Sequence, residues 1–277
     1  MISLSLIGFL SLFGSSIGSN HGGLECRALN RPVVDEVYPT ATVLPKNLLR
    51  FYVYFNREMD RESSRDQITI RTESGDVLDG LLLPSRFELW SENARRLTLI
   101  LDPGRVKTGL SNGQSLDAGF EVGARFTLVI GKGLASIDGC RLSSDFEHEF
   151  LITKPDTEIP DPHAWVLTIP SVGSRDPLTV SLRKPLDHLS LAYRIRVQTD
   201  AGHVVSGAIA LGAHDEQWRF TPTSPWTESA YRLVVDPELE DLAGNRPTGL
   251  FDDPSGDSRR RQSSAEALVR VFELNRN

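Results

Sequence analysis

Apolar and polar residues alternate along several short stretches of the chain. Within residues 49–56, an apolar side chain at every second position alternates with Tyr52, Tyr54 and Asn56. A period of two predicts a β-strand with one buried face. Similar short apolar segments follow at 68–71, 97–99, 126–130 and 146–152. Because no segment shows the 3.6-residue period of a long amphipathic helix, the pattern predicts an all-β chain.

The strand pattern occurs twice. Residues 51–80 recur as residues 178–207 at a constant offset, since 187 − 60 and 202 − 75 are both 127. The offset then shortens along the chain, because residues 97–99 match 218–220 and residues 126–130 match 231–235. A shortening offset places an insertion in the first copy, between Leu99 and Phe126, and its Pro- and Gly-rich ends predict a loop.

Each copy carries about seven short strands separated by turn signals, which is the signature of a β-sandwich. We therefore predict two tandem sandwiches. The predicted boundaries are a signal peptide and N-terminal arm at 1–27, a first sandwich at 28–153, a linker at 154–162 and a second sandwich at 163–277. Three prolines make the linker a semi-rigid spacer. The second sandwich is expected to carry a flexible loop near 252–266, where Asp, Ser and Gly are frequent.

Certain turn residues recur in both copies and are expected to specify the fold. An Asp at a strand end accepts hydrogen bonds from backbone N–H groups in the following turn. Glycine supplies the positive φ of tight hairpin turns, and Gly and Asn both tolerate the left-handed conformation. The residues to which we assign these roles are Asp60, Gly75, Asp187, Gly202, Asp241, Gly244 and Asn245.

The N-terminus predicts export. Residues 1–24 carry no Asp, Glu, Lys or Arg, and the apolar run 2–13 is too short to span a bilayer but suits the core of a secretory signal. Because no Lys or Arg precedes that run, a buried apolar strand is the alternative interpretation. No second apolar stretch has the length of a membrane span, so we expect a mature chain without a transmembrane segment. The expected location is secreted, periplasmic or cell-surface.

Two cysteines, Cys26 and Cys140, leave three alternatives open. In an oxidising compartment they could form one disulfide between the N-terminal arm and a turn of the first sandwich. Lipid attachment at Cys26 is the second alternative, although Leu24 and Glu25 fit a bacterial lipobox poorly. Unpaired thiols are the third alternative, and of the three it is the expectation that we favour.

Charge and motifs exclude several classes of function. The formal net charge of −7 argues against a nucleic-acid binder, which needs a basic face. The sequence contains no H-E-x-x-H, P-loop or paired C-x-x-C motif. A G-x-S-x-G pattern at 14–18 lies within the predicted signal peptide, where it carries no hydrolase chemistry. We therefore expect a protein that is not an enzyme and that holds no cofactor.

Two metal hypotheses concern the second copy. His188, His203 and His214 could form a metal site only if they converged, which their positions at separate turns argue against. The acidic turn around Glu240, Asp241 and Asn245 carries oxygen ligands of the kind that Ca²⁺ prefers, and a plain acidic turn is the alternative.

A glycan hypothesis rests on aromatic residues. Trp90 and Trp226 lie next to turns, where exposed indole rings could stack on sugars, whereas Trp165 and Trp218 fall at strand positions. The sequence leaves this alternative open.

The order of motifs resembles one family. Residues 55–60 (FNREMD), a hairpin, a Leu-Thr-Leu strand and a D-x-x-G-N turn together resemble the bacterial Ig-like domain of the S-layer-protein type. Residues 241–245 match its terminal turn, whereas the first copy has Cys140 in place of the Asn and the second departs from the first motif at 182–187. The resemblance covers roughly residues 37–153 and 163–250. It implies Ig-like sandwiches in an exported protein with a structural, spacing or adhesive role.

These observations together predict an exported, non-enzymatic structural or protein-interaction module of the cell envelope. Its partner would be an envelope protein or a glycan, and exposed edge strands could pair with a partner chain. A carbohydrate-binding module is the main alternative. An envelope hydrolase with an unrecognised site is the third.

Overall fold

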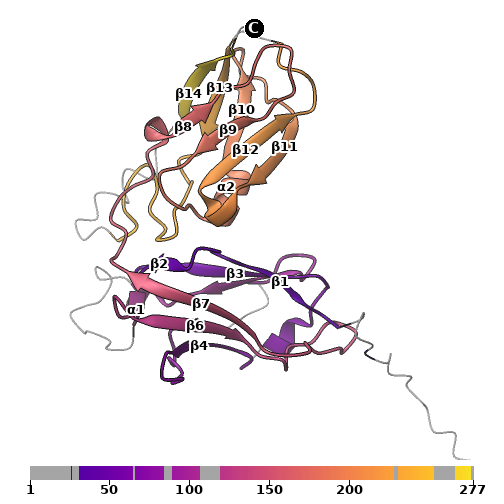
Figure 1. Ribbon diagram of the computed structural model, residues 1–277, viewed down its shortest axis with the longest axis vertical. Coiled ribbons are helices and arrows are strands. Elements are labelled where there is room, and N and C mark those ends of the chain that lie inside the picture. The colour runs from indigo at the N-terminus through magenta and orange to yellow at the C-terminus, as the bar shows by residue number, and fades with distance from the viewer. Residues whose placement is uncertain are drawn as a thin grey trace, which may run out of the picture.

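The computed structural model describes residues 26, 31–64, 66–83, 89–106, 119–227, 230–252 and 266–275. In this part of the chain the strands run from β1 to β14 and the helices are short (Figure 1). The helices are α1 (Pro103–Val106), α2 (His188–Tyr193) and the 3-10 turns η2 (Arg61–Ser64), η4 (Pro162–Ala164) and η5 (Ala213–Asp215). The all-β prediction is confirmed. The signal-peptide prediction, most of the insertion and most of the loop near 252–266 fall outside the described residues.

The first sandwich consists of two sheets. One has the strand order β1-β3-β5, with β1 (Val34–Tyr38), β3 (Arg50–Phe55) and β5 (Arg96–Ile100). The other has the order β2-β7-β6-β4, with β2 (Val43–Pro45), β7 (Phe146–Thr153), β6 (Arg125–Ile130) and β4 (Ile68–Thr72). All pairs are antiparallel except β2 with β7. The inward-facing apolar residues of both sheets form one buried cluster.

The second sandwich has four strands facing three. The larger sheet has the order β11-β12-β9-β8, with β11 (Gly207–Leu211), β12 (Gln217–Pro222), β9 (Leu178–Ser181) and β8 (Val166–Thr168). The smaller sheet has the order β10-β13-β14, with β10 (Ile195–Thr199), β13 (Ala230–Val235) and β14 (Leu268–Glu273). This order corresponds strand by strand to the constant-type immunoglobulin sandwich. A second apolar cluster, which includes Trp218 and Tyr231, fills it.

The strand bounds confirm the predicted correspondences between the two copies. Strands β4 and β10 keep the offset of 127 at both ends, since 195 − 68 and 199 − 72 are equal. Strands β6 and β13 keep the offset of 105 at both ends, since 230 − 125 and 235 − 130 are equal. The repeated sequence therefore specifies repeated sheets. The exact division of the chain into 28–153, 154–162 and 163–277 stays a prediction.

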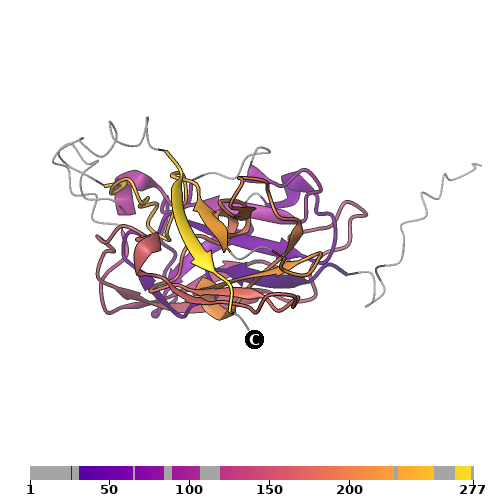
Figure 2. The same cartoon turned by 90° about the horizontal axis from the view of Figure 1, so that it is seen from above.

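One face of β3 departs from the expected burial. The alternation along this strand predicts that Tyr52 faces solvent, yet Tyr52 is only 2% exposed. The second sandwich stands over this side of the first, above β1 and β3, and the two overlap when viewed along the long axis (Figures 1 and 2). Strand β3 therefore has two buried faces, one toward its own core and one toward the other sandwich.

A buried polar joint as the candidate functional site

The polar contacts between the two sandwiches begin at an aspartate that the repeat singles out. In the first copy, Oδ1 of Asp60 accepts a hydrogen bond from the N–H of Glu62 at 3.0 Å. In the second copy, Asp187 is the N-cap of α2, and its Oδ1 accepts from the N–H of Ser190 at 2.9 Å. Both contacts are of the kind that an Asp side chain makes with backbone N–H groups of the turn that follows it.

The other oxygen of Asp187 reaches across to the first sandwich. Its Oδ2 accepts a hydrogen bond from the Tyr52 hydroxyl at 2.8 Å, and Asp187 is only 3% exposed. Burial raises the pKa of Asp187, and nearby Arg50 opposes this rise. Burial also raises the pKa of Tyr52, and the Asp187 carboxylate raises it further. Tyr52 therefore stays protonated and donates, while Asp187 accepts.

Alternating charges extend this contact. Arg50 of the first sandwich donates a hydrogen bond to Glu240, and its Nε lies 3.8 Å from Asp187. Glu240 also accepts from Arg246 at 2.8 Å, and Arg246 in turn pairs with Glu238 at 2.7 Å. Burial lowers the pKa of Arg50, but Tyr52, Asp187 and Glu240 raise it by more, so the guanidinium stays charged. Each buried charge thus has a partner of opposite sign.

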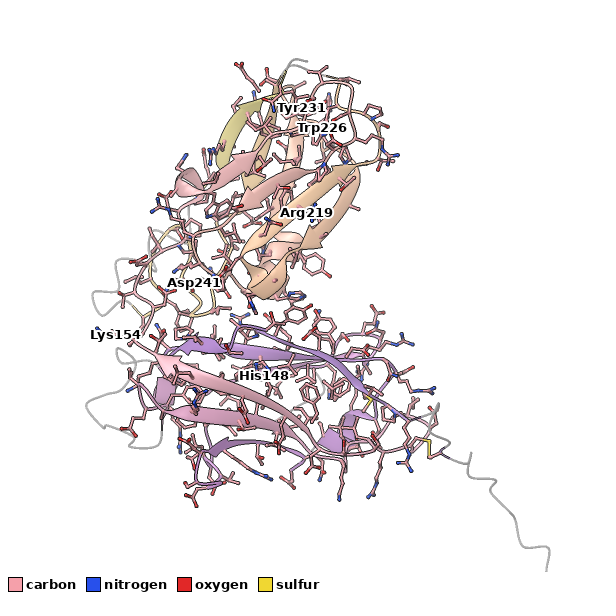
Figure 3. All side chains as sticks on the ribbon, in the orientation of Figure 1. His148, Lys154, Arg219, Trp226, Tyr231 and Asp241 are labelled. Atoms are coloured by element: carbon pink, nitrogen blue, oxygen red, sulfur yellow. A yellow bond between two sulfur atoms is a disulfide. The ribbon has the colours of Figure 1, made fainter. Side chains whose placement is uncertain are left out.

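A second set of contacts fixes the linker. Nζ of Lys184 donates to Asp156 in the linker at 2.6 Å and to Asp241 at 2.8 Å. Asp241 lies at the end of the second sandwich that faces the first (Figure 3). From the first sandwich, Asn47 exchanges two hydrogen bonds with the backbone of Asp156, at 2.8 and 2.9 Å. Asn245 donates to the same Asp156 carbonyl at 3.1 Å. One linker residue is therefore held by both sandwiches.

Apolar and aromatic contacts complete the joint. Leu242 of the second sandwich belongs to the buried cluster of the first, and its carbonyl accepts from the N–H of Leu49 at 2.9 Å. Tyr38 stacks on His188 with ring centroids 3.5 Å apart, and Tyr54 meets His188 edge-on at 5.7 Å. We define the joint as these contacts together with the two polar sets described above.

The calcium candidates occupy the joint, where their oxygens have other partners. Asp241 is fully buried and accepts from Lys184 and from the N–H groups of Ala243 and Asn245. Burial raises its pKa to about 6, against the opposing effect of Lys184. Glu240 is paired with two arginines. Within the described residues, no three His, Cys, Asp or Glu side chains are grouped to hold a metal. The calcium hypothesis stays a prediction.

The glycines of the fold motif adopt the expected backbone, and the asparagine does not. Gly75, Gly202 and Gly244 have φ values of 90°, 89° and 76°. Asn245 is not among the residues with positive φ, so it does not use the left-handed conformation that its residue type tolerates. Its side chain instead donates to Asp241 and to the linker and accepts from the N–H of Phe251. Sequence reasoning identified the residue but missed this contact role.

Two of the three histidines, His188 and His214, contact the first sandwich. His188 is in the joint, where its Nδ1 lies 2.9 Å from Asp215. The ring of His214 lies 3.3 Å from the Thr40 hydroxyl, and His203 sits in the hairpin turn after β10.

Both tryptophans proposed for sugar stacking are buried, so that prediction is wrong. Trp90 is 6% exposed and packs against Phe55. Trp226 is 1% exposed and packs edge-on against Tyr231 at 4.9 Å, inside the far end of the second sandwich (Figure 3). Proximity to a turn did not imply exposure, because a large ring reaches from a turn back into the core.

The cysteines form a disulfide. Cys26 and Cys140 are bonded, with their Cα atoms 5.4 Å apart. The favoured expectation of unpaired thiols is therefore wrong. Lipid attachment at Cys26 is also ruled out in this state, because the sulfur that would carry the lipid is already bonded. Within the described residues, no helix has the length and apolar character needed to cross a membrane.

No family model matches this chain, and no curated protein matches it in sequence. Solved structures that this chain matches include the N-terminal part of the bacterial S-layer protein SbsC, with 15% identity and a TM-score of 0.30, over 74% of this chain and 40% of that one. A segment of native alpha-2-macroglobulin from Escherichia coli has 14% identity and a TM-score of 0.28, over 88% and 71%. A pair of titin Ig domains has 11% identity and a TM-score of 0.25, over 89% and 96%. This chain thus spans less than half the length of the S-layer chain that it matches.

Proposed function

We propose that the protein is an exported, non-enzymatic structural or protein-interaction module of the cell envelope, in which the joint holds two Ig-like sandwiches in one relative orientation. The joint carries this proposal. Tandem domains move relative to one another unless their interface prevents it. Here Tyr52 and Asp187 complete their hydrogen bonds across the interface, and Arg50 pairs with Glu240 across it. A rotation would break both contacts and deprive the buried Arg50 guanidinium of its two carboxylate partners.

Further observations support the envelope assignment. A disulfide such as that between Cys26 and Cys140 persists in an oxidising compartment. The apolar run 2–13 is typical of a secretory signal. The resemblance of residues 241–245 to the terminal turn of S-layer-type Ig-like domains agrees with a surface location. The joint itself favours binding over catalysis, because its carboxylates are already engaged by Lys184, Arg50 and Arg246.

Strand β11 offers a partner chain a free edge. It ends the sheet order β11-β12-β9-β8 and consists of Gly, Ala, Ile, Ala and Leu, with no charge and no proline. The N–H of Gly212 donates to the Gln217 carbonyl, and the N–H of Thr223 donates to the Ser206 carbonyl. These two bonds determine which residues of β11 direct their backbone groups toward β12. By antiparallel alternation, the backbone groups of residues 207, 209 and 211 point away from β12. Natural edge strands usually carry a Lys, a Pro or a bulge that prevents such pairing.

The other edge strands of the described sheets carry a charge, carry a proline or are short: β4, β5 and β10 contain Arg71, Arg96 and Arg196, and β8 has three residues. Strand β1 has a register shift between Val34 and Glu36 and contains two acidic residues. Strand β2 has three residues and ends in Pro45. Strand β14 contains Arg270, which donates to the carbonyls of the segment before β8. Since β11 lacks these features, we place the partner-binding edge of the proposed module there.

The first experiment tests the joint. Spin labels at exposed Glu73 and Ala201, one on each sandwich, would report the distance between them by double electron–electron resonance. We expect one narrow distance distribution for the wild-type protein and a broader one for the Arg50→Ala, Tyr52→Phe double variant. A broad distribution in the wild type, or an unchanged one in the variant, contradicts a fixed orientation.

The second experiment tests the edge. A photo-crosslinking residue at Ala208 would capture a partner from an envelope extract, with Val269 on β14 as the matched control position. We expect one protein to be enriched from position 208 only, and Ala210→Lys to abolish its capture. Equal capture at both positions, or capture that survives Ala210→Lys, excludes β11 as the binding edge.

A further inference from the structure

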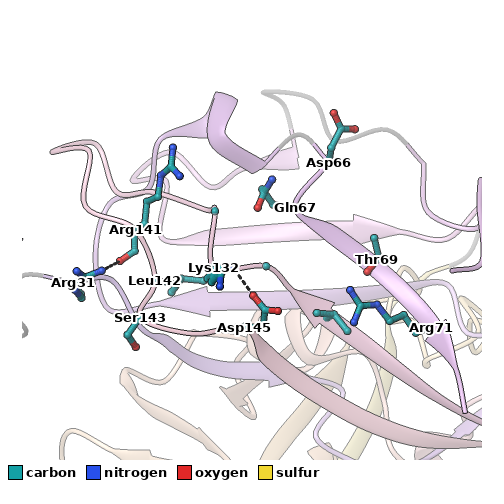
Figure 4. A pocket seen from close by; sticks show the side chains of 13 residues that line it. Arg31, Asp66, Gln67, Thr69, Arg71, Lys132, Arg141, Leu142, Ser143 and Asp145 are labelled. Carbon is teal, nitrogen blue, oxygen red and sulfur yellow. Dashed lines mark hydrogen bonds between the residues drawn. The ribbon is translucent and has the colours of Figure 1, made fainter. Parts of the chain in front are cut away.

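A cationic groove lies on the first sandwich, away from the joint. It encloses about 640 Å³ beside β4 and β6 (Figure 4). Four basic residues line it, and the acidic residues in the lining are Asp66 and Asp145. The basic residues are Arg31, Arg71, Lys132 and Arg141.

The basic side chains are not neutralised within the described part of the chain. None of the four takes part in an ion pair there, whereas Arg50, Lys184 and Arg246 in the joint all do. Of the lining carboxylates, Asp145 accepts from the backbone N–H of Lys132 at 2.8 Å. Four basic against two acidic groups leave an excess of positive charge, on a chain whose formal net charge is −7. Such a local reversal of sign attracts anions.

The groove is held by rigid contacts. Lys132 lies between Gly131 and Gly133 in a turn that presses on Gln67, since a Cβ at Gly133 would lie 2.0 Å from the Gln67 Oε1 atom. Gly131 also donates its N–H to the Gln67 carbonyl at 2.6 Å. The Gln67 side chain and the Lys132 backbone are therefore fixed relative to each other.

Two of the basic residues, Arg31 and Arg141, lie close in sequence to the two cysteines of the disulfide. Arg141 directly follows Cys140, which is bonded to Cys26 of the N-terminal arm. Nη1 of Arg31, five residues after Cys26, donates to the Arg141 carbonyl at 3.3 Å. The Arg31 guanidinium therefore lies at one side of the groove, next to the Arg141 carbonyl (Figure 4).

We propose that this groove binds an acidic glycan. Guanidinium groups form paired hydrogen bonds with planar carboxylates, which suits a uronate. The side chains of Gln67, Thr69 and Ser143 in the same lining offer donors and acceptors for sugar hydroxyls. Because the groove-lining residues include no aromatic ring for stacking, binding depends on charge and weakens with salt. The edge of β11 plays no part in this site.

Calorimetric titration of the full chain with a defined oligogalacturonate at low salt tests the proposal. The Arg71→Gln, Arg141→Gln double variant should raise Kd by about tenfold, which corresponds to the loss of two exposed ion pairs. The matched control is Arg95→Gln with Arg219→Gln, which removes the same charge from two exposed positions elsewhere and should leave Kd unchanged. Arg31→Gln alone should weaken binding by about threefold and keeps the test valid if the double variant fails to fold.

Three results would overturn the proposal. One is that oligogalacturonate does not bind at low salt. Another is that the control pair loses as much affinity as the groove pair. The last is that polyphosphate or polyglutamate binds as tightly as oligogalacturonate, which would make the groove a general polyanion site. A neutral galactan completes the set and should not bind.

Discussion

The hydrogen bond from Tyr52 to Asp187 can be weighed by removing a single oxygen atom. Tyr52→Phe leaves the ring in place and deprives Oδ2 of Asp187 of its donor at 2.8 Å. A hydrogen bond to a charged group contributes about 1.5–3 kcal/mol. Asp187 keeps its bond from Ser190 and an arginine at 3.8 Å, so we expect a loss near the lower end, about 1.5 kcal/mol. For a chain of this size, that loss lowers Tm by about 3–6 °C.

The charge of Asp187 decides how much Tyr52→Phe lowers the free energy of unfolding. Asp187→Asn keeps an N-cap residue for α2, because Asn caps as well as Asp. In that background Tyr52 bonds to a neutral amide, so Tyr52→Phe should cost only about 0.5–1 kcal/mol. Tyr193→Phe is the matched control, since Tyr193 of α2 is 76% exposed and its hydroxyl makes no contact with Asp187.

Urea unfolding of the wild type, the two single variants and the double variant measures this coupling. The reasoning is refuted if Tyr52→Phe changes the free energy of unfolding no more than Tyr193→Phe does. It is also refuted if Tyr52→Phe costs the same in the Asp and Asn backgrounds. In either case the Tyr52–Asp187 hydrogen bond would contribute no stability to the joint.

Three further effects are expected. Burial raises the pKa of Asp241 to about 6, above its ordinary value near 3.9, so its contribution to stability is present at low pH and is lost as pH rises through about 6. Asp241→Asn should remove a slope of up to about 1.4 kcal/mol per pH unit from the free energy of unfolding. Urea unfolding across this range would show equal slopes for the wild type and the variant if this is wrong. Reducing the Cys26–Cys140 bond, which joins residues 114 apart, should lower the free energy of unfolding by about 2–4 kcal/mol; a Tm insensitive to reductant contradicts this. Gly207→Ala would place a methyl group 2.4 Å from Phe220 and should cost about 1–3 kcal/mol, whereas a wild-type unfolding midpoint would show that the ring moves freely.

Sheet formation could be predicted because its signals are local. A period of two, a glycine turn and a repeat at constant offset are all visible along the chain, and they located β4 and β10 correctly. The joint could not be predicted in the same way. Alternation shows that Tyr52 lies on the polar face of its strand, but it cannot show that another sandwich covers that face.

The two copies differ at one equivalent position, and the structure shows what each residue does there. Cys140 stands where the second copy has Asn245. In the structure each residue secures the segment that precedes its own sandwich, Cys140 by a disulfide to Cys26 and Asn245 by a hydrogen bond to Asp156. The sequence showed that the position is equivalent. It could not show that two different chemistries serve the same purpose, because neither Cys26 nor Asp156 belongs to the repeated segment.

In both sandwiches, a segment near the start of the sandwich pairs in parallel with its last segment. In the first, β2 runs alongside β7, with bonds from Leu151 to Thr42 and from Lys46 to Thr153. In the second, Ser171 and Asn275 form a parallel bridge. While the Cys26–Cys140 bond is intact, a pull on the two ends of the chain passes through the disulfide into β7 and leaves the β2–β7 bonds unloaded. The parallel bridge of the second sandwich is then the one that is loaded in shear. Reduction of the disulfide would therefore bring the β2–β7 bonds into the path of the tension.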